Sequence, residues 1–185
     1  SEPKMDKFEA MTEGMASGFI QDMIEPPFKT IHEDFQLIIE DNAVEMDVAA
    51  EFTERGVQLD FNSRALFESG SATIKPASVP ILEEMMIAIE EMELEEYRVE
   101  VEGHTDDTSV GEKSIYPSNW ELSAARAASI VRFFVERSIP PHFLKASGFA
   151  DTRPKVPNFD VEGNPIAENR NLNRRVVVHI MRVQR

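Results

Sequence analysis

The sequence contains no cysteine among its 185 residues. This absence excludes disulfide bonds, thiolate metal ligands and cysteine nucleophiles, but it does not fix the cellular compartment, because proteins inside and outside the cytoplasm can both lack cysteine. No stretch approaches the roughly 20 consecutive apolar residues that a membrane-spanning helix needs. The start, Ser1 to Lys4, also lacks the apolar core of a signal peptide. If the protein works outside the cytoplasm, we expect this chain to be a fragment or a processed form.

Positive charge is also scarce. The chain has 19 lysines and arginines against 34 aspartates and glutamates, which gives a formal net charge of −15. Nucleic-acid-binding modules usually display a basic stripe that neutralises phosphates, so we expect no nucleic-acid partner. Hydrophobic residues make up 42% of the chain, which is too much for wholesale disorder. The length fits one folded core, with or without an attached arm.

The N-terminal part shows two amphipathic stretches that are separated by Pro26 and Pro27. Apolar residues in both stretches recur at spacings of three and four, which predicts helices. They are Phe8, Met11, Met15, Phe19 and Met23 in the first, and Phe28, Ile31, Phe35, Ile38 and Ile39 in the second. We interpret residues 1–43 as a helical arm or linker. Its stripes could pack on the main domain or pair in a dimer, whereas an acidic polar face disfavours a membrane surface.

From residue 44 the apolar period changes to two, which is typical of strands. The alternating residues are Val44, Met46 and Val48, followed by Val57, Leu59 and Phe61. Between these runs, Glu54 to Gly56 predicts a hairpin turn in which Gly56 adopts a positive φ. We therefore expect the compact domain to comprise residues 44–185.

Strands and helices alternate in the rest of the domain. Spacing predicts helices around 82–92 and 119–137, and strands at 97–103, 145–149 and 175–183. This order predicts an α/β (α+β) fold in which helices stack on a mixed sheet. Because Glu100 and Glu102 alternate with apolar residues, the other face of the sheet should be open to water.

The helix expected at 119–137 contains one anomalous residue. Arg126 lies inside its apolar stripe, one turn from both Leu122 and Ile130. A guanidinium there needs a partner, because an unpaired buried charge costs several kcal/mol. Asn119 projects from nearly the same face two turns earlier. The two side chains could converge on one ligand.

A polar loop beginning at Gly103 follows a predicted strand end, where α/β folds gather ligand-binding loops. Asp106 in this loop and Arg126 form a candidate pair of opposite charges, although a plain salt bridge or a helix-capping aspartate would explain the spacing equally well. His104, Asp106 and Asp107 superficially resemble a metal cluster, but no partner histidine is near in sequence. We expect no metal, no cofactor and no catalytic role.

Three further features each have two interpretations. Residues 169–175 crowd three arginines into an acidic protein, as either a solvated basic turn or a carboxylate-binding patch. We interpret Trp120 as a packing anchor rather than a ligand-stacking platform. We interpret His179 as a packed or rim residue rather than a ligand.

Several motifs in this order resemble the OmpA-like peptidoglycan-binding domain over roughly residues 55–183. The motifs are Val101–Asp106, Asn119–Ala127, Gly148–Ala150 and Asn173–Val176. Within that superfamily, the stretches Phe67–Ala72 and Tyr116–Ser123 and the long loop after Asp107 most resemble the MotB and PomB flagellar stator proteins. The resemblance implies an OmpA-like βαβαββ sandwich preceded by the helical arm.

The resemblance also implies a ligand, which is the diaminopimelate residue of the peptidoglycan stem peptide. Asp106 would meet its ammonium group and Arg126 its carboxylate. Thr108 and Asn119 match polar pocket positions, and Arg174 matches the arginine that closes the site. Arg170 is a secondary candidate for the site, because residues 160–169 depart from the family pattern.

At the level of the whole protein, the resemblance implies a periplasmic domain that anchors the flagellar stator to the cell wall. It would act as a homodimer, with a MotA-type subunit joined through a membrane helix that this chain lacks. The alternatives are another OmpA-like wall anchor, of the Pal or OmpA type, or an interaction module without a motor role.

Overall fold

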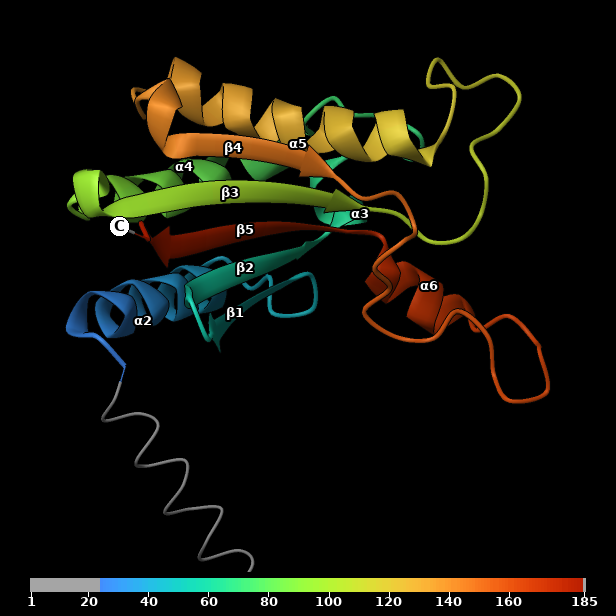
Figure 1. Ribbon diagram of the computed structural model, residues 1–185, viewed down its shortest axis with the longest axis horizontal. Coiled ribbons are helices and arrows are strands. Elements are labelled where there is room, and N and C mark those ends of the chain that lie inside the picture. The colour runs from blue at the N-terminus through green and yellow to red at the C-terminus, as the bar shows by residue number, and fades with distance from the viewer. Residues whose placement is uncertain (1–23, 185) are drawn as a thin grey trace, which may run out of the picture.

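The computed structural model describes residues 24–184 as a five-stranded sheet with helices on one face (Figure 1). Of the two N-terminal stretches, the first therefore lies outside the described residues. The elements are α2 (Pro26–Asp41), β1 (Val48–Thr53), β2 (Gly56–Asn62), α3 (Ser63–Leu66), α4 (Val79–Glu90), β3 (Tyr97–His104), α5 (Asn119–Glu136), β4 (Leu144–Gly148), α6 (Ala167–Asn173) and β5 (Arg175–Arg182). Among these helices, none is long and apolar enough to cross a membrane.

The strands lie in the order β1-β2-β5-β3-β4. Neighbours are antiparallel except β3 and β4, which run parallel and are joined through α5. The last strand, β5, therefore lies in the middle of the sheet. This arrangement confirms the predicted mixed sheet and the expected OmpA-like α+β order.

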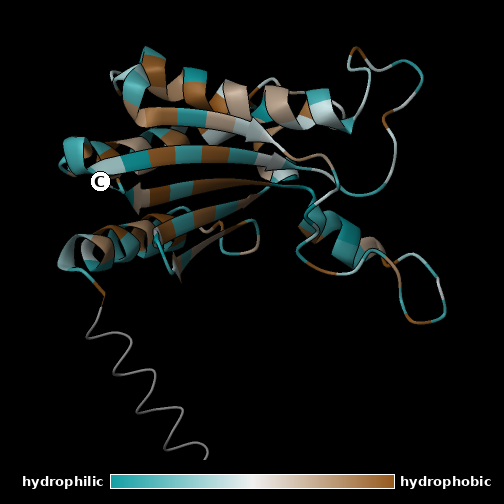
Figure 2. Ribbon diagram, viewed as in Figure 1, coloured by the Kyte–Doolittle hydropathy of each residue, from teal (hydrophilic) through white to brown (hydrophobic). Residues whose placement is uncertain are grey.

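The two faces of the sheet differ in polarity, as the strand alternation predicts. Buried apolar side chains from β2, β3 and β5 meet α2, α4 and α5 in one core. On the other face, Gln58, His179, Glu100 and Lys145 form one cross-strand row of half-buried or exposed side chains. Figure 2 shows the resulting alternation of hydrophobic and hydrophilic residues along β3.

Helix α2 packs in the same core as the sheet. Pro26 and Pro27 start the helix, where their missing N–H groups cost nothing, and the Asn42 side chain donates to the Ile38 carbonyl at its end (2.8 Å). Its stripe is buried. We assigned this stretch to the arm, but α2 packs against the sheet as part of the compact unit. Of the alternatives for the second helix, packing on the main domain is therefore the one observed. The role of residues 1–43 as a linker stays a prediction.

The first strand starts later than its alternation suggests. Residues 44–47 form a turn, Met46 is 87% exposed, and β1 begins at Val48, which pairs with Phe61. The hairpin itself is confirmed. Gly56 has a φ of +155°, and a Cβ there would lie 2.2 Å from the Ile180 carbonyl oxygen. Only glycine fits this turn without moving β5.

Candidate functional site

The candidate site lies at the end of the sheet where β3 stops and β5 begins. His104 pairs with Arg175 in the antiparallel register, so Asp106 after β3 and Arg174 before β5 emerge side by side. Figure 1 shows the loop after β3 and the segment around α6 projecting beyond this same end. Residues far apart in sequence therefore meet here.

Two glycines bring α5 into direct contact with the sheet. A Cβ on Gly103 would lie 2.0 Å from the Ser123 carbonyl oxygen, and one on Gly148 would lie 2.5 Å from the Ala124 nitrogen. Both neighbours are backbone atoms, which cannot give way as a side-chain tip could. The Ser118 hydroxyl caps the helix by accepting from the Trp120 N–H (3.1 Å). The start of α5 is thereby held beside the β3 loop.

Asp106 is the centre of a hydrogen-bonded network. It is only 5% exposed, and its Oδ1 accepts from the Thr108 N–H (2.8 Å) while its Oδ2 forms an ion pair with Arg174. The Asn119 side chain donates to the Thr108 carbonyl (2.9 Å). The structure thus brings together four of the predicted site residues: Asp106, Thr108, Asn119 and Arg174.

Arg126 is buried, as its place in the stripe predicts, but it does not pair with Asp106. It is 5% exposed, and it donates from Nε to the Ser71 carbonyl (2.8 Å) and from Nη2 to the Glu68 carbonyl (3.3 Å). Asp106 and Arg126 therefore form no direct ion pair among the described residues, and their role as two charges of one ligand site stays a prediction. The loop after α3 brings its carbonyls to the guanidinium, and Arg174 takes the carboxylate.

The charge of Arg126 has no counter-ion within the described chain, because no carboxylate lies within 4 Å of it. Burial lowers the pKa of its guanidinium, which the nearby Tyr116 raises and Arg174 lowers. An arginine nevertheless stays charged at neutral pH. Among the described residues, Arg126 is therefore a buried cation that lacks an anion, and the charge of Arg174 is close enough to affect its pKa.

Arg170 forms a bidentate ion pair with Asp107 that the sequence did not predict. Its Nε and Nη2 donate to the two carboxylate oxygens of Asp107 at 2.8 and 2.9 Å. The hydrogen bonds from Arg170 hold the pKa of the Asp107 carboxyl below its usual value. Because Arg170 lies in α6, within the stretch that we interpreted as a basic turn or a carboxylate-binding patch, this pair ties α6 to the β3 loop.

Asn173 organises the segment that precedes α6. It is buried, its oxygen accepts from the N–H groups of Lys155 and Val156, and its nitrogen donates to the Val156 carbonyl and to the Asn158 side chain. Arg175 also donates to backbone carbonyls. The arginines of this stretch are therefore not simply a solvated turn, because each has a specific partner.

His104 and His179 both approach one carboxylate oxygen of Glu102, at 3.2 and 3.3 Å. These two neighbours hold the pKa of Glu102 well below its usual range. His179 thus lies at a rim, as expected. In the part of the chain that the structure describes, no group of three side chains could hold a metal ion.

Trp120 does not fill the role that we expected of it. It is 52% exposed at the start of α5, so its interpretation as a packing anchor is wrong. The direct contacts that hold α5 on the sheet are instead those of Ser123 with Gly103 and of Ala124 with Gly148.

Much of the candidate site lies in a region that matches a known protein family. The model of the OmpA family matches residues 66–168, which is more than half of the chain. The chain belongs to the OmpA family. The matched range includes Asp106, Thr108, Asn119 and Arg126, whereas Arg170 and Arg174 lie just beyond it.

Within the OmpA family, the chain is a MotB-type domain. It is 27% identical to Motility protein B of Bacillus subtilis over 83% of the chain and 56% of that relative. The chain thus spans only about half the length of the curated relatives that it matches first. A putative MotB-like protein from Desulfovibrio vulgaris has a TM-score of 0.73 at 27% identity, over 84% of this chain and 94% of that one.

Two other solved structures show the range of proteins that share this fold. The periplasmic domain of Helicobacter pylori MotB has a TM-score of 0.63 at 27% identity, over 74% of this chain and 89% of that chain. The cell wall anchor of the T6SS from Pseudomonas aeruginosa has a TM-score of 0.67 at 27% identity, over 80% of this chain and 95% of that chain.

Proposed function

We propose that this domain binds peptidoglycan through the diaminopimelate residue of the stem peptide and so anchors its parent protein to the cell wall. The observation that carries the proposal is Arg126, a buried cation that has no carboxylate partner among residues 24–184 and whose pKa is lowered by burial and by the charge of Arg174, the partner of Asp106. The carboxylate of a zwitterionic amino acid would supply the anion that Arg126 lacks, and its ammonium group would bind Asp106 beside Arg174.

Each site residue has a distinct role in this proposal. The ligand carboxylate would meet Arg126, and its ammonium would meet Asp106, whose orientation is already fixed by the Thr108 N–H. Arg174 would close the site from the β5 side, and Asn119 would hold the Thr108 backbone in place. Arg170 would act only through Asp107, as a positioning residue. Such a site binds and does not catalyse.

Co-sedimentation with purified peptidoglycan tests the proposal. We expect the wild-type chain to pellet with sacculi that contain diaminopimelate, and Arg126→Ala to remain in the supernatant. Arg132→Ala, an exposed arginine of the same helix, serves as the matched control and should pellet normally. If the wild type does not pellet, anchoring is wrong. If Arg126→Ala pellets as well as the wild type, anchoring stands but the pocket assignment fails.

We further propose that the parent protein is a flagellar stator subunit, based on its similarity to MotB proteins. The domain would lie in the periplasm as a homodimer, and a membrane helix outside this chain would join a MotA-type subunit. Replacing the corresponding domain of a MotB protein with this chain tests the role. Swimming should be retained, and it should be lost when the replacement carries Arg126→Ala.

A second candidate is a wall anchor for another machine. The similarity to the anchor of the T6SS favours this alternative, because it matches the fold about as well as the MotB domains do. Binding to sacculi would be the same in both cases, so the domain-replacement experiment separates them. A replacement that pellets with sacculi but does not support swimming would favour the second candidate.

A further inference from the structure

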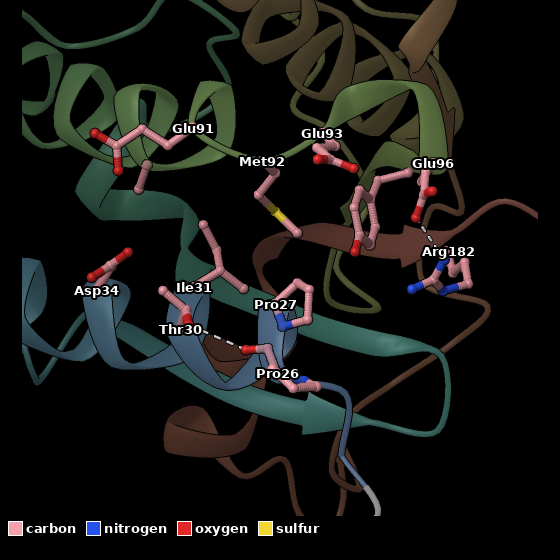
Figure 3. Close-up of a pocket in the computed structure, with 12 residues that line it drawn as sticks. Pro26, Pro27, Thr30, Ile31, Asp34, Glu91, Met92, Glu93, Glu96 and Arg182 are labelled. Carbon is pink, nitrogen blue, oxygen red and sulfur yellow. Dashed lines mark hydrogen bonds and ion pairs between the residues drawn. The ribbon is translucent and has the colours of Figure 1, made fainter.

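A groove of about 510 Å³ lies at the end of the sheet opposite the Asp106 site (Figure 3). Helix α2 forms one wall and the end of α4 forms the other, while the first residue of β3 closes the base. Apolar side chains line its depth, among them Ile31, Met92 and Tyr97. Figure 3 shows Met92 and Ile31 between the two walls. The groove offers a place for an apolar side chain from outside.

The rim of the groove is acidic. Asp34 stands on the α2 wall, and Glu91 and Glu93 stand on the other wall (Figure 3). These three carboxylates have no cationic partner among residues 24–184. Arg182 is the basic residue among those that line the groove, and it is already paired with Glu25 and with Glu96 (2.8 Å). The rim therefore presents uncompensated negative charge.

Tyr97 adds a polar group that lacks a partner. The residue is 2% exposed and lines the groove, and its hydroxyl makes no hydrogen bond within the described chain. Burial raises its pKa, an effect that Arg182 opposes and that Glu25, Glu96 and Glu93 reinforce. Beside carboxylates, a donor such as an ammonium or guanidinium group is the partner that it suits best.

We propose that this groove binds a basic, amphipathic segment of another protein, with an apolar side chain on the floor and lysine or arginine side chains against the rim. Amphipathic segments commonly bind in grooves between helices. Charge decides the occupant: a second copy of the chain carries −15, and residues 1–23 contain five acidic and two basic residues. Both would be repelled by the rim, whereas a basic segment is attracted.

The test uses a synthetic peptide of alternating leucine and lysine pairs as the probe, titrated into the full chain and followed by fluorescence anisotropy. The groove variant is Glu91→Lys with Glu93→Lys. The control, Glu45→Lys with Glu136→Lys, changes the net charge equally at exposed positions elsewhere. We expect affinity to fall at least tenfold in the groove variant and less than twofold in the control. Tyr97→Phe should weaken binding about threefold.

Several outcomes would overturn the proposal. Equal weakening in both double variants would mean that the peptide responds only to net charge. Unchanged binding in the groove variant would place the peptide elsewhere. Methyl NMR of the free chain tests other occupants: contacts between Met92 and Met11 or Met15 would assign the groove to the chain's own N-terminal segment. A changed oligomeric state in the groove variant would assign it to a second copy.

Discussion

Replacement of Arg126 by methionine should separate stability from binding. Methionine keeps much of the buried stem and removes the guanidinium. The change loses two hydrogen bonds to carbonyls, each worth about 1.5–3 kcal/mol when the donor is charged. It also removes the cost of burying an unpaired cation, which is several kcal/mol. Because these terms oppose each other, the free energy of unfolding should stay within about 2 kcal/mol of the wild-type value.

Binding should respond much more strongly than stability. Truncating one partner of a buried charge pair costs about 2–5 kcal/mol, which is roughly a 30-fold loss of affinity or more. Isothermal titration with a diaminopimelate-containing tripeptide measures the affinity, and urea unfolding measures the stability. Arg132→Met on the exposed side of α5 should change neither quantity. If a folded Arg126→Met protein binds within threefold of wild type, Arg126 is only a structural cation and the reasoning is refuted.

Three other substitutions test the framework of the site by urea denaturation. Glu102→Gln should lower the unfolding free energy by about 1–2 kcal/mol at pH 7; because the folded-state pKa is lowered, the difference should shrink as the pH falls below the usual value of about 4.3. Gly103→Ala should cost about 3 kcal/mol or more by pushing α5 off the sheet, whereas Gly111→Ala, which has open space, should change little. Asn173→Ala should lower the unfolding free energy by about 3 kcal/mol and speed hydrogen exchange at Lys155 and Val156. An unchanged unfolding free energy in Gly103→Ala or Asn173→Ala would show that the local backbone can relax.

Periodicity was sufficient to predict most of the fold, and its failures have local causes. The alternation at Val44 and Met46 continues into β1, but β2 ends at Asn62, whose N–H donates to the Asp47 carbonyl, so residues before 47 have no strand to pair with. Helix α6 has no apolar stripe that could reveal it. It is fixed by tertiary contacts of Arg170 and Asn173, which no local pattern encodes.

The members of the candidate site could be predicted, but their pairing could not. Helical spacing places Arg126 on the buried face, and the antiparallel register brings Asp106 to Arg174. Which oxygen Arg126 meets depends on the course of the loop after α3, and its sequence gives no sign that the Ser71 and Glu68 carbonyls point inward. The close contacts of Ser123 and Ala124 with two glycines of the sheet are likewise not considered in a helical-wheel argument.

The opposite placement of the chain entry and the site has a mechanical consequence. Glu25, which follows the first described residue, forms an ion pair with Arg182 beside the start of β3, and Asp106 lies just past the end of β3. A strand of eight residues separates the two points by about 26 Å. A pull between residue 24 and a ligand held at Asp106 would therefore run along the strands. The hydrogen bonds between β3 and β5 would bear that load together, in shear, rather than opening one at a time.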